Sequence, residues 1–162
     1  MLQEGDRMAD FQLPSTAGGD VRLSESLQRG PAVVLLMRGH WCSYCTEQLQ
    51  TFSHLSYDLW RHLDVDVLPV VGDPLPDLVE MRDRFDLRIQ LLADPDLTVA
   101  REYTGTEVND KRGHIAVAGT FVVDTDETIR YSHVADHPAD RTYANYVRHF
   151  LRGGFERPYT DD

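Results

Sequence analysis

The residues that decide the fold are 31–45, which read Pro-Ala-Val-Val-Leu-Leu-Met-Arg-Gly-His-Trp-Cys-Ser-Tyr-Cys. The apolar run 32–37 does not alternate with polar residues, which is typical of a strand covered on both faces. From Cys42 onward, apolar residues recur at helical spacing as far as residue 63. A buried strand therefore leads directly into two cysteines at the start of a long helix.

The rest of the chain continues the alternation of strands and helices. We expect an N-terminal β-hairpin from 10–13 and 21–23, a second strand at 65–71 despite Pro69, and a helix at 76–85. A short strand at 89–92, a helix at 97–103 with an Asp cap and a polar loop at 105–113 follow. Residues 119–123 and 128–134 form a hairpin, and a helix at 140–151 closes the domain. This order predicts an α/β fold with a central mixed sheet, helices on both faces and an N-terminal hairpin.

Length and composition limit the classes of protein to consider. The 162 residues suit one domain, here 1–152, followed by a polar tail at 153–162. The formal net charge of −11 opposes binding to nucleic acid and to anionic membranes. No apolar run approaches the roughly 20 residues of a membrane span, and the N-terminus has no secretory signal. We therefore expect a cytoplasmic protein without nucleic-acid or membrane partners.

Cys42 and Cys45 are the only cysteines, and their spacing of three points to reactive thiols. The start of a helix favours the thiolate, and two cysteines on one helical turn lie near the separation that a disulfide requires. Arg38 and His40 could add positive potential, and Trp41 is expected to cover the site by packing. The sequence favours redox chemistry over metal binding at this pair.

Two other functions remain open from the residues alone. Two thiolates with an imidazole suit a soft metal such as copper, and His114, His133 and His137 are the candidate third ligands, although solvated histidines are the simpler interpretation. An interaction domain with little turnover is the other alternative. Our prediction includes no cofactor and no metal site.

Several motifs resemble the peroxiredoxin-like, alkyl hydroperoxide reductase/thiol-specific antioxidant branch of the thioredoxin superfamily. Residues 5–14 resemble its opening hairpin, and 38–45 resemble a subgroup with Arg-Gly-x-Trp-Cys-Pro-Tyr-Cys, with Ser43 in place of the Pro. Residues 91–96 and 119–124 are similar to later landmarks. The resemblance implies a thioredoxin-like three-layer fold and an antioxidant dithiol oxidoreductase.

The resemblance implies two alternative roles for the cysteines. In a peroxiredoxin-like peroxidase Cys45 attacks the peroxide and Cys42 resolves, whereas in a thioredoxin-like disulfide reductase Cys42 attacks first. Ala118 stands where peroxiredoxins carry a catalytic Arg and thioredoxins a cis-Pro, and Gly119 and Thr120 beside it are further candidates. The implied partners are a peroxide or disulfide substrate and an external thiol reductant such as a thioredoxin or glutathione system. The resemblance also admits a homodimer.

Overall fold

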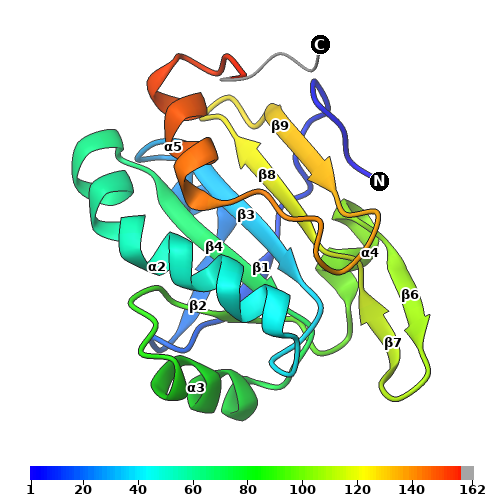
Figure 1. Ribbon diagram of the computed structural model, residues 1–162. Helices are drawn as coiled ribbons and strands as arrows, with labels where there is room; N and C mark the ends of the chain where they lie inside the picture. Colours follow the sequence, from blue (N-terminus) through cyan, green and yellow to red (C-terminus); the bar gives the residue numbers. More distant parts are fainter. Residues whose placement is uncertain (158–162) are drawn as a thin grey trace.

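The centre of the molecule is a five-stranded mixed sheet, seen in a computed structural model that describes residues 1–157 (Figure 1). The strand order is β5-β4-β3-β8-β9, with β3, β4 and β5 parallel and β8 and β9 antiparallel to their neighbours. This confirms the predicted mixed sheet. The strands are β3 (Ala32–Met37), β4 (Asp66–Val71), β5 (Leu92–Ala93), β8 (Gly119–Val123) and β9 (Ile129–Val134).

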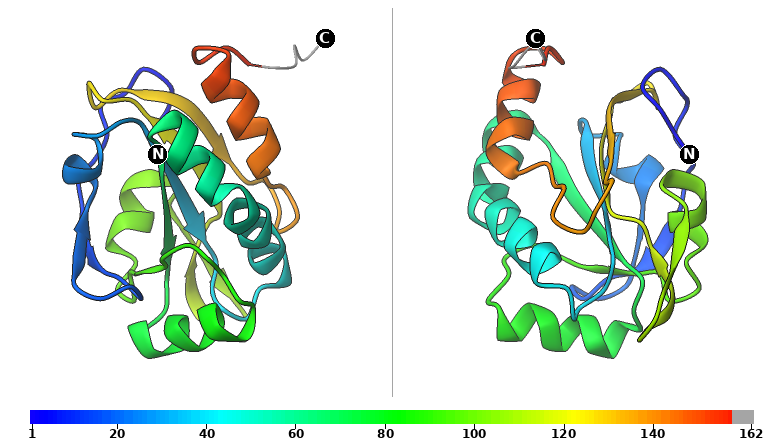
Figure 2. Two further views of the ribbon diagram at one scale, coloured as in Figure 1. Left: turned by 90° about the vertical axis from the view of Figure 1, so that its left-hand side faces the viewer. Right: turned by 45° about the vertical axis from the view of Figure 1, so that its right-hand side comes forward.

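Helices and a hairpin cover the two faces of this sheet, which gives three layers (Figure 2). Alternate side chains of β3 enter two separate apolar clusters, which explains why all six of its residues are buried and apolar. One cluster contains residues of α2 (Ser43–Leu63), α3 (Leu75–Arg84) and α5 (Ala144–Arg152). The other lies beneath α1 (Leu23–Ser26), α4 (Thr98–Tyr103) and the N-terminal hairpin of β1 (Gln12–Pro14) and β2 (Asp20–Arg22).

Pro69 lies inside β4 without disrupting it. Strand β5 pairs only with Val70 and Val71, so at Pro69 strand β4 has β3 on one side and no paired strand on the other. A proline, which cannot donate a backbone hydrogen bond, is tolerated at such an edge position.

Three predicted segments differ from the structure. The strand expected at 89–92 is instead β5, which overlaps it only at Leu92. The predicted polar loop at 105–113 contains a hairpin arm, β6 (Thr106–Asn109) paired with β7 (Gly113–Ala116). The arm is mostly exposed, so its sequence lacks the apolar alternation that identifies a half-buried strand. The closing helix begins at Ala144, not at Asp140, and the non-helical residues 140–143 reach the cysteines.

The first part of the predicted tail packs against the domain. The rings of Phe155 and Phe150 lie 5.8 Å apart, and Arg157 pairs with Glu4 near the N-terminus. Residues 158–162 of that tail lie outside the described part of the chain. Within residues 1–157 no helix is long and apolar enough to cross a membrane.

Candidate active site

Strand β3 ends at Met37, and the loop that follows it places Cys42 at the N-cap of helix α2. Cys45 lies in the first turn of the same helix. Both are free thiols; the Cys42 residue is 4% exposed and Cys45 is fully buried. The predicted placement of the dithiol at the start of a long helix is therefore confirmed, with both sulfurs beneath the surface.

Arg141 contacts both sulfurs from the loop between β9 and α5. Its Nη2 is 3.3 Å from Cys45 Sγ and 3.7 Å from Cys42 Sγ. The same guanidinium donates through Nε to the carbonyl of Pro138 at 2.8 Å and through Nη1 to Gln48 Oε1 at 3.2 Å. With a further contact of Nη1 to Met37 Sδ at 3.8 Å, five contacts fix the guanidinium against the dithiol.

Gln48 connects this arginine to the sheet. Its side chain is buried, and its Nε2 donates to the carbonyl of Thr142 at 2.7 Å and to Thr120 Oγ1 at 3.2 Å. The Thr142 hydroxyl lies 2.8 Å from Tyr131 Oη on β9. Gln48 therefore holds the loop and the arginine in place together, because both of its polar ends are engaged.

Arg38, the first residue after β3, also contacts both thiols. Its backbone N–H donates to Cys45 Sγ at 3.4 Å, and its Nη1 lies 3.7 Å from Cys42 Sγ. Its Nε lies 3.9 Å from Glu107 on strand β6. Trp41 has the guanidinium carbons of Arg38 and Arg112 each 5.0 Å from its ring centroid, so the β6–β7 arm borders the dithiol.

The two thiols differ in acidity. The pKa of Cys42 is lowered from 9.0 to about 5, chiefly because the Cys45 thiol donates a hydrogen bond to the Cys42 sulfur; Arg38 and Arg141 add to the effect, while burial opposes it. Burial raises the pKa of Cys45, which stays protonated as the donor. Cys42 is therefore the thiolate of the pair at neutral pH.

Comparison with known proteins agrees with this fold. The sequence profile of the AhpC/TSA family matches residues 5–132. The chain belongs to the AhpC/TSA family. It is thus a thiol-dependent oxidoreductase of the peroxiredoxin type, as the sequence motifs predicted.

Individual relatives of this AhpC/TSA protein cover most of its length. A Mycobacterium tuberculosis protein with the provisional name of a peroxiredoxin is 29% identical over 135 residues, which are 79% of this chain and 82% of the relative. The crystal structure of peroxidoxin BcpB from M. tuberculosis has a TM-score of 0.82 at 24% identity, covering 94% of this chain and 98% of that one. Reduced 2-Cys peroxiredoxin from Plasmodium vivax has a TM-score of 0.77 at 11% identity, covering 93% and 94%. These structures confirm the thioredoxin-like fold.

The remaining candidate site residues of the AhpC/TSA protein, at positions 118–120, differ in their contacts with the site. Thr120 contacts Gln48 and so belongs to the support of the site, whereas Ala118 and Gly119 are buried next to it and carry no polar side chain. The resemblance suggested that a guanidinium is lost at Ala118. Instead Arg141 supplies one from beyond the residues matched by the family profile. No short motif surrounds Arg141, so no local pattern indicated its role.

The histidines considered as third ligands of a metal bound by the two thiols do not cluster with those thiols. His133 Nε2 pairs with Asp140 at 2.8 Å, while His114 and His137 are exposed. His40 turns towards Asp73 at the end of β4: its backbone N–H donates to Asp73 Oδ2 at 2.7 Å. Within residues 1–157, the group of side chains close enough to share a metal ion is His40, Asp73 and Asp77, and it includes neither thiol.

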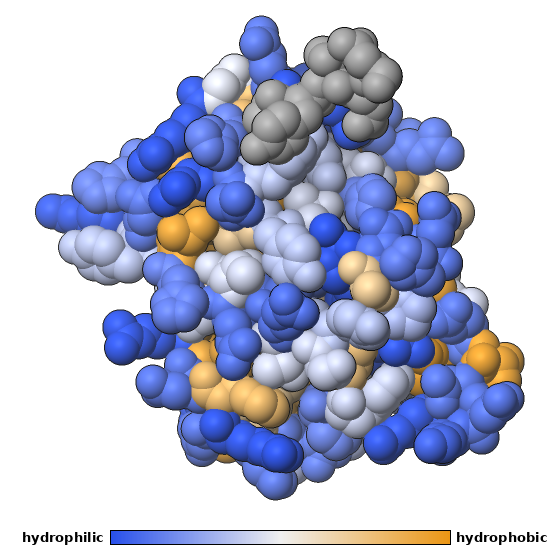
Figure 3. All heavy atoms as spheres, in the orientation of Figure 1, coloured by the Kyte–Doolittle hydropathy of each residue, from blue (hydrophilic) through white to orange (hydrophobic). Residues whose placement is uncertain are grey.

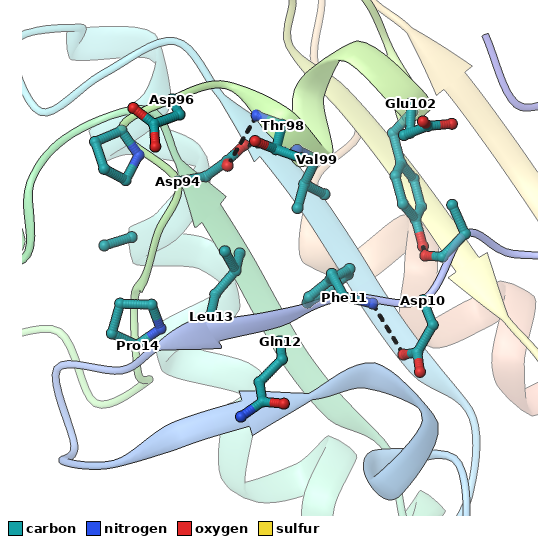
Figure 4. Close-up of a pocket in the computed structure, with 14 residues that line it drawn as sticks. Asp10, Phe11, Gln12, Leu13, Pro14, Asp94, Asp96, Thr98, Val99 and Glu102 are labelled. Carbon is teal, nitrogen blue, oxygen red and sulfur yellow. Dashed lines mark hydrogen bonds between the residues drawn. The ribbon is translucent and has the colours of Figure 1, made fainter.

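A pocket of about 430 Å³ lies on the opposite side of the sheet from the dithiol. Figure 4 shows it between strand β1 and the start of helix α4, with Phe11, Leu13 and Val99 among its walls. Tyr103 also lines it but uses its hydroxyl to donate to the Ala9 carbonyl at 2.7 Å. Neither cysteine lines this pocket, so it is not the site of the thiol chemistry.

Proposed function

We propose that the protein reduces hydroperoxides with Cys42 as the attacking thiolate and Cys45 as the resolving thiol. The observation that carries the assignment is the asymmetry of the pair. Cys42 is at the helix N-cap, has a pKa of about 5 and faces two guanidinium groups, whereas Cys45 is fully buried with a raised pKa. A thiolate is the reactive form of cysteine, so the ionised sulfur attacks first.

The proposed cycle has three steps. The Cys42 thiolate attacks the nearer peroxide oxygen, the O–O bond breaks, and the leaving oxygen takes a proton to become an alcohol or water; Cys42 becomes a sulfenic acid. The Cys45 thiol then attacks the Cys42 sulfur, which forms the Cys42–Cys45 disulfide and releases water. An external thiol donor supplies two electrons and two protons to restore the dithiol.

Arg141 supports the peroxide step. Negative charge develops on the leaving oxygen as the O–O bond breaks, and a fixed guanidinium beside the attacking sulfur is suited to stabilise it. The contacts of Arg141 with Pro138 and Gln48 orient this group before substrate binds. In this proposal Arg141 does the work of the arginine that peroxiredoxins carry at the place of Ala118.

Burial of the sulfurs favours a small substrate over a protein disulfide. The Cys42 residue is only 4% exposed, so a protein disulfide could reach its sulfur only after the surrounding loop moved. A hydroperoxide needs a much smaller opening. This difference leads us to prefer the peroxidase over the disulfide reductase, which would use the same attacking sulfur.

The reducing partner follows from the product. The Cys42–Cys45 disulfide must be reduced by thiol–disulfide exchange, and a thioredoxin or glutathione system is the proposed donor. The homodimer and the cytoplasmic location expected from the sequence stay predictions, the former to be checked by analytical ultracentrifugation.

Substitution of each cysteine tests the proposal. The Cys45→Ser variant should consume one equivalent of hydrogen peroxide and form a sulfenic acid at Cys42, detected as a dimedone adduct by peptide mass spectrometry. The Cys42→Ser variant should not react at a comparable rate. The unsubstituted protein should turn over with a thiol donor and should reduce peroxide far faster than it reduces insulin disulfides.

Two results would contradict this assignment. Sulfenic acid at Cys45 in Cys42→Ser, formed as fast as in the other variant, would make Cys45 the attacking residue. Insulin reduction without peroxide consumption would make the protein a disulfide reductase.

A further inference from the structure

Three side chains converge from three separate segments near the loop that precedes Cys42. His40 lies on the loop after β3, Asp73 follows β4, and Asp77 is in the first turn of α3. Their ligand atoms all lie within 4.8 Å of one another. Such convergence of an imidazole and two carboxylates is the first requirement for a metal site.

The contact between the His40 imidazole and Asp73 does not have the geometry of a hydrogen bond. His40 Nδ1 is buried and has no hydrogen-bond partner, although it lies only 3.1 Å from Asp73 Oδ2. Two ligand atoms that are each about 2.0–2.1 Å from one tetrahedral ion are about 3.3–3.4 Å apart. The observed separation is close to that value, so the two atoms are arranged as neighbours around one ion.

The backbone holds this arrangement in place. Asp73 is 9% exposed, and its Oδ2 accepts the backbone N–H of His40 at 2.7 Å. The carboxylate is therefore fixed on the loop that carries the imidazole, before any ion binds. Preorganised ligands of this kind reduce the entropic cost of binding.

The surrounding charge favours a cation. Asp77 and Glu80, one turn apart on α3, line a pocket of about 170 Å³ together with His40 and Arg84. Two ligand carboxylates and Glu80 exceed the single charge of Arg84. A set of one nitrogen and two oxygen ligands suits zinc or a similar first-row divalent ion, because calcium and magnesium prefer oxygen ligands alone.

We infer that His40, Asp73 and Asp77 form a binding site for a divalent transition-metal ion of the zinc type, with water completing its coordination. The ion would connect the loop before Cys42 to the junction of β4 and α3. The thiols are not ligands of this site, which distinguishes it from the copper-handling alternative and departs from our expectation that the chain has no metal site. The inference does not depend on the proposed peroxidase function.

Zinc binding by a protein without thiols tests this inference. Cysteine thiolates themselves bind zinc, so the starting protein is the untagged, full-length Cys42→Ser/Cys45→Ser variant, checked for folding by circular dichroism. Isothermal titration calorimetry at neutral pH should show one zinc ion per chain. Adding His40→Ala or Asp77→Asn should weaken binding at least 10-fold, while the exposed His54→Ala should leave it unchanged.

Cobalt(II) provides a second readout in the protein with both thiols present and reduced. One bound equivalent should give visible d–d bands without a sulfur-to-cobalt charge-transfer band in the near ultraviolet. The inference is overturned if the thiol-free variant binds no zinc, if Asp77→Asn binds as tightly as its parent, or if the first equivalent of cobalt shows sulfur ligation. Asp77 makes the better variant than Asp73, because Asp73 also holds the loop through its backbone contact.

Discussion

At the scale of single residues, the acidity of Cys42 depends on neighbours that act in opposite directions. Hydrogen bonds from Cys45 and Arg38 and the charge of Arg141 lower its pKa, while burial raises it. The sequence locates the two cysteines and predicts a thiolate at the helix start. Only the structure shows which sulfur receives the hydrogen bond and which is fully enclosed.

Thiolate absorbance near 240 nm should therefore titrate with a midpoint at about pH 5 in the reduced protein. The pKa is lowered, so the thiolate persists above this pH, and the rate of reaction with hydrogen peroxide should fall as the pH drops through it. Cys42→Ser should remove the transition, because Cys45 has a raised pKa. A midpoint near pH 8 or 9 would show that the contacts do not activate Cys42.

Arg141 is the residue whose loss should most affect the peroxide step without removing a thiol. Arg141→Met should lower the second-order rate constant for hydrogen peroxide on the order of 100-fold, because one preorganised donor to the leaving oxygen is lost. Stopped-flow fluorescence can follow the reaction, at a pH where Cys42 is still ionised in the variant. Arg141→Lys should retain part of the rate, since it keeps the charge but not the planar fork.

A matched control for Arg141→Met is Arg152→Met, which removes the same group from an ion pair with Asp58 on the surface. Its rate constant should equal that of the unsubstituted protein. If Arg141→Met also reacts at the unsubstituted rate, Arg141 has no part in the reaction.

At the scale of elements, the local sequence predicts the positions of strands and helices best where buried apolar residues recur in a regular pattern. Strand β3 and helix α2 satisfy that condition, and their predicted positions are confirmed. The β6–β7 arm does not, because Thr106, Glu107 and Val108 are all exposed, the last by 72%. Helix α5 begins later than its sequence predicts for a different reason: the carbonyl of Thr142 accepts a hydrogen bond from Gln48, a contact that the local pattern does not contain.

Helix α4 gives a test at this scale, because one buried carboxylate caps it. Asp94 accepts the backbone N–H groups of Thr98, Val99 and Ala100 at 3.0–3.2 Å. Asp94→Ala should lower the free energy of unfolding by about 2 kcal/mol, measured by urea denaturation, since three donors lose their partner. The exposed neighbour provides the control: Asp96→Ala should change it by less than about 0.5 kcal/mol. Equal effects of the two substitutions would refute the capping role.

At the scale of the whole molecule, two features matter: the polarity of the surface and the packing of residues 153–157 against the domain. The face in Figure 3 is mostly hydrophilic with small separated hydrophobic groups, as expected for a net charge of −11. The C-terminal segment returns to the domain, with Phe155 against Phe150 and Arg157 paired with Glu4. Residues 153–157 therefore contribute to the domain, although the sequence predicts that the domain ends at residue 152.

Removing the Phe155 ring should measure this contribution. Phe155→Ala should lower the free energy of unfolding by about 1–3 kcal/mol, because a half-buried aromatic side chain loses its contact with the core. Urea denaturation compares it with Glu156→Ala, an exposed neighbour that should have little effect. Indistinguishable midpoints for the two variants would mean that the segment adds no stability.

The order of the central elements and the position of the dithiol could be predicted from the amino-acid sequence. Both follow from local patterns: a continuous apolar run, a helical repeat and two cysteines three residues apart. The surroundings of the sulfurs depend instead on the folded chain. Arg141 is 96 residues from Cys45, and Asp73 is 33 from His40. Contacts across such separations depend on how the sheet brings its loops together, which no local pattern contains.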